Sequence, residues 1–436
     1  MLLPSTPSVV AFALALLPLA SAAPLSDIYQ TISVGGLSVP LTNSKSGAPI
    51  TKEDGTVNLV SLQRQLSLVR AKYQTTIANY LRNTGEALGE ILDQAEKRVN
   101  NASTSNDGNK NSKRQSEPIY NYGNDLLWAG RVGLGTPMQD FTIMFDTGSA
   151  DFWVPSADIK CTGCQGNKYD PTLSTTSKRQ NGHFAIAYGD GSSSSGPIYT
   201  DVSTIGDFTD NARYFSAVDQ MSDSFSNEPE DGIMGMAYAS ISNIHSTSQP
   251  KDTSRPFGLR LAKTVDGNSE LHLGGPNEDF YKGDFEWHQV RKRAYYNISG
   301  QIQLNGDNVF RAASRASIID SGTTLIVAPA AEAATFWSQV PGAQVYDDAE
   351  GYWTYPCAQP PKLSFTFDHG QQWSVRPVDF NLGRTSYNSK RCVGAVAAID
   401  VGLGKSTWIL GCTFLKNVYT VFDPSNRNSV GFATLA

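Results

Sequence analysis

The chain contains the stretches Phe145-Asp146-Thr147-Gly148-Ser149 and Ile319-Asp320-Ser321-Gly322-Thr323, whose aspartates lie 174 positions apart (320 − 146). In each stretch an Asp follows apolar residues and precedes a hydroxyl residue and a Gly. Such a turn can present a carboxylate at the end of a buried strand. One Asp-Thr-Gly is common by chance, but two related copies in one chain indicate a duplicated fold that brings two carboxylates to one centre.

The repeat extends beyond the Asp turns. Gly232-Ile233-Met234-Gly235 follows the first Asp and Trp408-Ile409-Leu410-Gly411 follows the second, at offsets of 87 (233 − 146) and 89 (409 − 320) residues. Apolar-apolar-Gly triplets are frequent, but nearly equal spacing makes coincidence a poor explanation. The matched landmarks therefore predict two homologous lobes.

Together these motifs resemble those of the pepsin-like aspartic endopeptidases, especially the secreted fungal type. The likeness runs from about Tyr120 to the C-terminus. Besides the two Asp turns, the stretches that carry it are Trp153-Val154-Pro155, Tyr188-Gly189-Asp190-Gly191-Ser192, Asp231 to Gly235 and Trp408 to Phe414. The resemblance implies an all-β, bilobal pepsin-like fold with a cleft between two homologous β lobes. It also implies an enzyme that hydrolyses peptide bonds at acid pH without a metal or other cofactor.

Asp146 and Asp320 are the catalytic residues that the resemblance implies. Two carboxylates within hydrogen-bonding distance resist ionising together, so the pair shares one proton, as is known for aspartic proteases. The ionised Asp takes a proton from a water molecule, and the protonated Asp donates to the scissile carbonyl. No covalent intermediate is expected.

The neighbours of these aspartates are expected to support them. By resemblance, Ser149 and Thr323 hydrogen-bond the outer carboxylate oxygens, whereas Thr147 and Ser321 reach across to the opposite lobe. Ordinary turn bonding is the alternative for these hydroxyls. Gly148 and Gly322 let backbone amides approach the carboxylates, since a Cβ there would crowd them.

The sequence from Tyr188 to Ser192 has the chemistry of a hairpin tip and matches the flap that closes over bound peptide in this family. Tyr188 and Gly189 would line the pocket together with Ile233, and Trp153 would steady the Tyr188 hydroxyl. Asp190 resembles the fungal variant of the flap, in which a carboxylate receives a basic side chain. We therefore expect cleavage after large apolar residues, with Lys also tolerated.

The N-terminal part of the chain differs from the rest. An apolar stretch followed by Ala20-Ser21-Ala22 predicts a signal peptide over residues 1–22 and hence secretion, with vacuolar delivery as the alternative. Residues 23–114 are interpreted as a pro-segment, cut after Lys113-Arg114, and apolar spacing predicts a helix over Leu59–Leu81. Family resemblance suggests that a pro-segment Lys pairs with the active-site carboxylates, with Lys72 as the candidate.

Charge separates the two parts. Residues 1–114 carry 11 Lys and Arg against 8 Asp and Glu, net +3, and the remainder carries 24 against 33, net −9, which together restore the chain's −6. Ion pairs between a basic cover and an acidic enzyme weaken as carboxylates protonate, so acid-triggered release is a hypothesis. The acidic balance argues against nucleic acid as a partner. Polypeptide substrates and the chain's own pro-segment are the expected partners, with no membrane attachment and a monomeric state.

The remaining chain is expected to form an N-terminal lobe over residues 115–288 and a C-terminal lobe over 289–436, rich in strands. Short helices are predicted at Arg255–Lys263 and Ala328–Gln339. Family resemblance supports the disulfides Cys161–Cys164 and Cys357–Cys392, which leave Cys412 as a free thiol, interpreted as buried. Asn297 and Asn101 are glycosylation acceptors in an exported chain.

Two other functions compete with this interpretation. A catalytically inactive pepsin-like relative could bind proteins or inhibit enzymes, but such relatives typically lose an Asp, a motif Gly or the flap Tyr, all of which this chain keeps. A glycosidase also uses two carboxylates, although duplicated Asp-hydroxyl-Gly turns are not its pattern. The five His residues show no metal-ligand spacing, so no metal site is expected.

Overall fold

The computed structural model describes residues 49–89, 92, 115–123, 125–160, 166–187, 193–221, 229–244, 255–311, 314–347, 349–425 and 427–436. Several sequence predictions lie outside these ranges: the signal peptide, Asn101, Lys113, Arg114, Cys161, Cys164 and the hairpin tip from Tyr188 to Ser192.

Within the described residues the fold is mainly β, as predicted. A 13-stranded sheet runs in the order β11-β25-β24-β9-β10-β1-β2-β3-β8-β4-β7-β6-β5. Its strands are β1 (Gln115–Tyr122), β2 (Leu127–Leu134), β3 (Gln139–Asp146), β4 (Phe152–Lys160), β5 (Lys178–Ala187), β6 (Ser193–Ile205), β7 (Phe208–Met221), β8 (Gly232–Gly235), β9 (Phe257–Arg260), β10 (Ser269–Leu273), β11 (Tyr281–Gln289), β24 (Tyr419–Asp423) and β25 (Ser429–Leu435). The last two strands, β24 and β25, pair with β9 and β11 respectively. The sheet therefore contains strands from both halves of the chain and joins them.

The second half of the chain builds two smaller sheets. The 8-stranded sheet contains β12 (Asn297–Leu304), β13 (Asp307–Asn308), β14 (Arg315–Ile319), β15 (Ile326–Ala328), β18 (Leu363–Phe367), β19 (Gln372–Ser374), β22 (Val396–Ala398) and β23 (Thr407–Leu410). The 4-stranded sheet contains β16 (Gln344–Val345), β17 (Trp353–Pro356), β20 (Asn381–Arg384) and β21 (Arg391–Gly394). Three short helices accompany them: α3 (Ala330–Ser338), α4 (Pro377–Phe380) and α5 (Cys412–Leu415).

The internal repeat seen in the sequence is a repeat of topology. β3, which ends at Asp146, pairs in parallel with β8, and β8 pairs antiparallel with β4. β14, which ends just before Asp320, pairs in parallel with β23, and β23 pairs antiparallel with β15. Each apolar-apolar-Gly triplet is therefore the strand beside an Asp strand, which explains why the two offsets are so similar.

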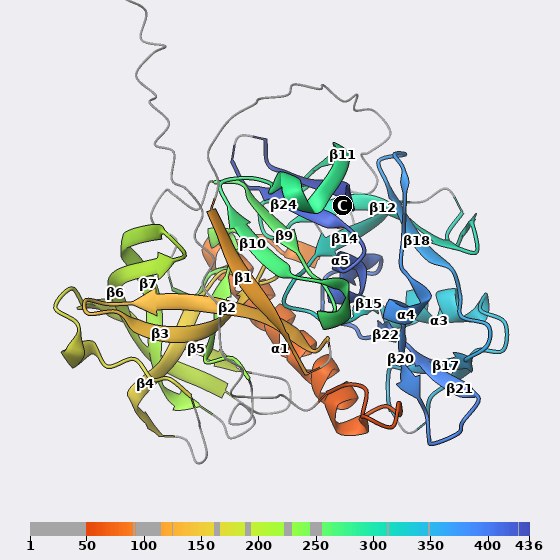
Figure 1. Ribbon diagram of the computed structural model, residues 1–436, viewed down its shortest axis with the longest axis horizontal. Helices are drawn as coiled ribbons and strands as arrows, with labels where there is room; N and C mark the ends of the chain where they lie inside the picture. Colours follow the sequence, from red (N-terminus) through yellow and green to blue (C-terminus); the bar gives the residue numbers. More distant parts are fainter. Residues whose placement is uncertain are drawn as a thin grey trace, which may run out of the picture.

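Helix α1 (Leu59–Thr84) is the long helix of the described chain, and in Figure 1 it crosses in orange between the yellow-green lobe and the cyan-blue lobe. Asn58 caps its N-terminus, where the Asn58 side chain accepts the Ser61 N–H. Gly85 caps its C-terminus in the left-handed conformation. The apolar residues at helical spacing, among them Leu62, Leu66 and Tyr73, are buried in one cluster with residues of the C-terminal half such as Ile318 and Leu325. The predicted helix is confirmed and ends three residues later than expected.

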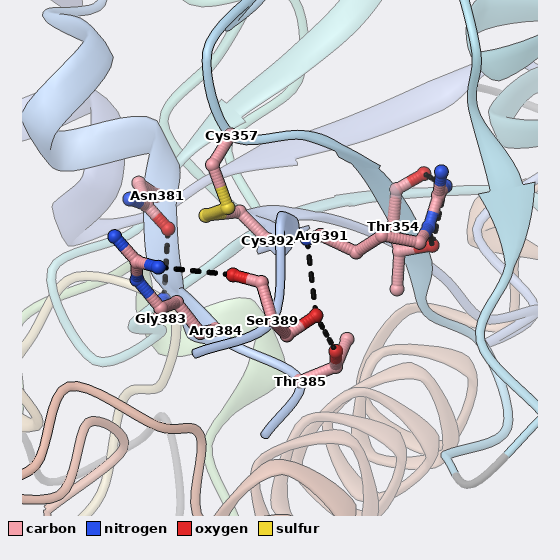
Figure 2. The surroundings of a disulfide bond; sticks show 9 residues. All are labelled: Thr354, Cys357, Asn381, Gly383, Arg384, Thr385, Ser389, Arg391 and Cys392. Carbon is pink, nitrogen blue, oxygen red and sulfur yellow. Dashed lines mark hydrogen bonds between the residues drawn. A yellow bond between two sulfur atoms is a disulfide. The ribbon is translucent and has the colours of Figure 1, made fainter. Parts of the chain in front are cut away.

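A disulfide joins Cys357 and Cys392, closing a separation of 35 residues beside the 4-stranded sheet (Figure 2). Next to it, Arg391 fixes β21 to β17 because its Nε donates to Thr354 Oγ1 at 2.8 Å. Cys412 is a free, buried thiol, as expected from the odd number of cysteines.

One prediction of local structure was wrong. The segment Arg255–Lys263 was expected to be helical, but Phe257–Arg260 forms strand β9 between β10 and β24. Phe257, Leu259 and Leu261 alternate and are all buried, which is the two-residue period of a strand. Pairing with two neighbouring strands outweighed the weak local preference of this segment for a helix. The other predicted short helix, at Ala328–Gln339, corresponds to α3.

Among the described helices, none combines the length and the hydrophobicity that crossing a lipid bilayer requires.

Candidate active site

The two Asp turns contact each other across the two lobes. Asp146 is the last residue of β3 and Asp320 directly follows β14, so each carboxylate is carried by the end of a buried strand. Their exposed fractions are 1% and 0%. Two acidic groups held together away from water are unusual and point to a chemical role.

Each carboxylate is held by a hydroxyl three residues further along the chain. Ser149 Oγ donates to Asp146 Oδ2 at 2.6 Å, and Thr323 Oγ1 donates to Asp320 Oδ2 at 2.6 Å. These bonds stabilise the ionised form of each acid and fix the direction of the carboxylate plane.

The other hydroxyls cross between the lobes. Thr147 Oγ1 donates to Ile319 O at 2.9 Å and accepts the Ser321 N–H at 2.9 Å. Reciprocally, Ser321 Oγ donates to Phe145 O at 2.7 Å and accepts the Thr147 N–H at 3.0 Å. This symmetric set of four bonds locks the two turns to each other, so the separation of the carboxylates does not depend on either lobe alone.

The two glycines are required by close approach. Their amides donate to the inner oxygens, Gly148 N to Asp146 Oδ1 at 2.8 Å and Gly322 N to Asp320 Oδ1 at 2.9 Å. A Cβ on Gly148 would lie 2.5 Å from the Asp320 carboxyl, and one on Gly322 would lie 2.1 Å from Asp146 Oδ1. Any side chain at either position would therefore push the two acids apart.

Helix α1 places a cation between the acids. Lys72 Nζ donates to Asp146 Oδ1 at 3.1 Å, to Asp320 Oδ1 at 3.0 Å and to Asp320 Oδ2 at 2.7 Å. The next residue, Tyr73, donates its hydroxyl to Asp320 Oδ2 at 2.8 Å, and its ring packs against Tyr295 at 5.3 Å between centroids. Tyr73 was not singled out from the sequence, although its place beside Lys72 in a helix was the available signal.

Polar contacts fix the helix over the acids along its length. At its N-terminal end Tyr352 donates to Leu62 O at 2.7 Å, and Thr324 donates to Gln65 Oε1 at 2.7 Å. At its C-terminal end Asn79 donates to Ile241 O at 3.1 Å, and Asn83 donates to the carbonyls of Ser240 and Ser242. The helix therefore bridges both halves of the molecule and covers the dyad.

This arrangement agrees with comparisons to known proteins. The model of the eukaryotic aspartyl protease family matches residues 127–435. The chain belongs to the eukaryotic aspartyl protease family. It is similar to an aspartic protease of Phaffia rhodozyma, with 36% identity over 94% of this chain and 94% of that protein. It is also similar to major aspartyl peptidase 1 of Cryptococcus neoformans var. grubii, at 30% over 98% of this chain and 88% of that one, and to pepsin A of Sus scrofa, at 31% over 73% and 84%.

The protein is thus an aspartic-type endopeptidase of the pepsin-like family. Burial raises the pKa of the Asp146 carboxyl, with Asp320 adding to the rise and Lys72 opposing it. Burial acts in the same direction on Asp320, but the charge and hydrogen bonds of Lys72 outweigh it and hold the pKa of Asp320 below its usual range. Lys72 itself keeps a raised pKa, because the attraction of both carboxylates exceeds the effect of burial. With α1 in place, Lys72, Asp146 and Asp320 therefore form a buried cluster of one basic and two acidic groups.

The aspartyl protease cleft keeps a cavity beside α1. It is lined by Lys72 and Asp146, by apolar side chains that include Trp153, Phe184 and Ile233, and by Glu230. Trp153 and Ile233 were expected at the substrate site and lie in this wall. Glu230 was missed, because the family motif begins at Asp231 and the sequence gives no sign of where the preceding side chain points.

One site expected from the sequence does not suit the folded chain. Asn297 begins β12 and has an exposed fraction of 0%. Its Oδ1 accepts the backbone N–H groups of Arg291 and Lys292 at 3.0 and 3.1 Å. A glycan on this amide would have no path to solvent, so the prediction of glycosylation at Asn297 is corrected. The Asn-x-Ser pattern reports the acceptor chemistry but not its burial.

Cys412 lies close behind the dyad, where its Sγ donates to Ser321 O at 3.2 Å. Burial raises the pKa of this thiol, so it stays protonated and serves as a weak hydrogen-bond donor.

Proposed function

We propose that this chain is the inactive precursor of a secreted endopeptidase that hydrolyses peptide bonds at acid pH with the Asp146–Asp320 dyad. The observation that carries the proposal is the bonding of Lys72 Nζ to both carboxylates at 2.7 to 3.1 Å from a helix that precedes the family domain. Residues 1–22 would direct export, residues 23–114 would form the pro-segment, cut after Lys113-Arg114, and residues 115–288 and 289–436 would form the two lobes of a monomer.

The chemistry proposed for the uncovered enzyme is general acid–base catalysis. Once Lys72 leaves, the two acids face each other without a cation, and mutual repulsion favours a single shared proton. The ionised member removes a proton from a water molecule, which attacks the scissile carbonyl, while the protonated member donates to the carbonyl oxygen. The hydroxyl and amide bonds to each acid keep both groups fixed through this exchange.

The covered form would be inactive for two reasons. Lys72 Nζ occupies the place between the carboxylates where the attacking water would lie, and α1 occupies the cleft that an extended peptide would need. Acid would favour release. The pKa of Asp320 is held low by Lys72, so its contribution to helix docking is present above the ordinary pKa of an Asp and is lost as pH falls through the lowered value.

A second ion pair, between Glu86 of the proposed pro-segment and Lys292, would also weaken as pH falls. Lys292 Nζ lies 2.8 Å from Glu86 Oε2 just beyond α1, and this hydrogen bond, with one from Tyr80, lowers the pKa of Glu86. Protonation of Glu86 would therefore also loosen the pro-segment. This pair is exposed, so its share is small beside that of Lys72.

The proposed substrates are polypeptides bound in the cleft, with large apolar side chains entering the wall that contains Trp153, Phe184 and Ile233. Tolerance of Lys through Asp190 belongs to the same proposal. Replacing Asp190 by Thr should selectively reduce cleavage next to Lys, and an equal loss on all substrates would count against that assignment.

The direct test is to incubate the purified secreted protein with denatured protein at pH 3 to 6. N-terminal sequencing should show processing near Gln115, and a statine-type peptide should block hydrolysis. A protein that is processed and folded but cleaves nothing, while still binding statine peptides, would be an inactive relative, and the proposal would fail.

A further inference from the structure

The cleft wall contains an acidic side chain that the proposed mechanism does not use. Glu230 lines the same cavity as Asp146, together with apolar side chains such as Met144 and Ile233. The side chain is half-buried, and its Oε2 atom is covered from solvent. A carboxylate in an apolar wall attracts a cation more strongly than one in open water, because the local dielectric response is weaker.

Glu230 is carried by a rigid support. The adjacent Asp231 accepts the Thr142 N–H at 2.8 Å and the Asn167 N–H at 2.9 Å, and its own N–H donates to Thr142 O at 2.7 Å. Immediately afterwards β8 pairs in parallel with β3, the strand that carries Asp146. The position of Glu230 is therefore fixed relative to the dyad by the same pair of strands.

The pro-segment shows which kind of side chain this part of the cleft receives. Besides Lys72 at the dyad, α1 brings a second basic residue, Arg64, to the wall of the cavity that Glu230 lines. Two cations from one helix thus face a cavity whose enzyme side presents carboxylates in an apolar setting. A substrate that replaces the helix would meet the same charges.

We propose that Glu230 is a specificity-determining residue that selects a Lys or Arg side chain of the substrate close to the scissile bond. The inference rests on the proposed function and deepens it, and it concerns the wall of the cleft, not the flap residue Asp190. The methylene stem of the basic residue packs against Met144 and Ile233, while its charged end meets the Glu230 carboxylate. A neutral side chain of equal length gains the packing but not the charge.

The distance between Arg64 and Lys72 on α1 indicates how far from the scissile bond a basic substrate residue would bind. Arg64 and Lys72 are eight positions apart (72 − 64), which is about 12 Å along a helix at 1.5 Å per residue. An extended peptide covers about 12 Å in three to four residues. A substrate side chain at the place of Arg64 would therefore lie within about four residues of the bond that is cut.

The test uses the acid-processed enzyme and a set of quenched fluorescent peptides with one scissile site. Each of the four positions on either side of that site carries in turn Lys or norleucine, which shares the Lys stem without its charge. The ratio of kcat/KM for Lys to that for norleucine is measured at pH 5 for the wild type, Glu230→Gln and Glu350→Gln. Glu350 is an exposed residue outside the cavity, so its variant controls for the loss of one negative charge.

At one position the wild type should prefer Lys, and Glu230→Gln should lower this ratio by about fivefold to tenfold while norleucine peptides change less than twofold. Glu350→Gln should keep the wild-type ratio. Glu230→Lys is the second variant, and it should favour Glu over norleucine at the same position. The inference is overturned if the wild type cleaves the peptides but Glu230→Gln changes Lys and norleucine equally at every position. Failure of the wild type to cleave any peptide would instead refute the proposed function.

Discussion

Replacing Lys72 by Met tests whether the buried cation holds α1, part of the proposed pro-segment, on the enzyme. Lys72 Nζ makes three contacts of 3.1, 3.0 and 2.7 Å with two carboxylates that are 1% and 0% exposed. Removing one partner from a buried ion pair costs about 3–5 kcal/mol. Because the dyad can take up a proton to relieve the lost charge, we expect a net loss of about 2–4 kcal/mol in helix docking, which is about 30- to 1,000-fold in the equilibrium.

The loss should appear as a change in the pH at which the enzyme opens. Each proton taken up on opening changes the docking free energy by about 1.4 kcal/mol per pH unit. Weaker docking means that less protonation is needed to open the enzyme, so the midpoint of activation should lie at a higher pH in Lys72→Met than in the parent. Acid favours opening of the parent because the pKa values of Asp320 and Glu86 are lowered, so their stabilising contributions to docking disappear as pH falls.

The assay needs a pro-segment that stays attached. Lys113→Ala with Arg114→Ala would block processing at the expected site, and hydrolysis of a fluorescent peptide would be followed from pH 6 to pH 3, normalised to the processed enzyme. Lys72→Arg keeps the charge and should stay close to the parent. Arg70→Met removes a charge from an exposed position of the same helix and should leave the midpoint unchanged. If the activation midpoint of Lys72→Met equals that of the parent, Lys72 does not hold α1 over the dyad, and the reasoning is refuted.

Three further outcomes are expected. Asp320→Asn should lower kcat of the processed enzyme by about 10³-fold or more while statine-peptide binding persists, and full turnover would disprove the shared-proton mechanism. Although burial alone would lower the pKa of His288, its hydrogen bond to Asp368 and its ion pair with Glu286 raise it. His288→Phe should therefore cost about 1–3 kcal/mol of stability at pH 5 and progressively less as pH rises through the raised value; a loss that is independent of pH would contradict this. Replacing Cys357 and Cys392 by Ser should lower the unfolding free energy of the C-terminal half by about 3–4 kcal/mol, measured by urea denaturation, since the bond closes a separation of 35 residues; an unchanged midpoint would show that the loop is held by other contacts.

The parts of the fold that could be predicted were those with a local signature. The Asp turns and the apolar-apolar-Gly strands are short patterns whose spacing reflects a duplicated topology, and β3 with β8 and β14 with β23 follow that pattern. Helix α1 was predictable because its apolar period lies within adjacent residues, although its end was predicted at Leu81 and lies at Thr84.

The features that escaped prediction depend on contacts between distant residues. The strand β9 at Phe257–Arg260 is stabilised by β10 and β24, and β24 lies more than 150 positions further along the chain. The burial of Asn297 comes from its place in β12 beneath a loop that donates to its side chain. Glu230 lines the cleft next to Asp231, whose side chain accepts backbone N–H groups from distant segments of the chain. In each case the residue type was visible in the sequence, but its surroundings were set by tertiary packing.

Protonation would serve two purposes at one place in this molecule. The carboxylates that bind Lys72 best are both ionised, whereas the dyad that hydrolyses a peptide needs one proton. A fall in pH that adds this proton weakens the grip on Lys72 and at the same time leaves the dyad in its working state. Since Ser149, Thr323, Thr147 and Ser321 bond the turns independently of the helix, the site would keep its geometry when α1 leaves. In the proposed mechanism, protonation of the dyad would favour both release of α1 and catalysis, so the pH that opens the cleft and the pH at which the dyad begins to work should lie close together.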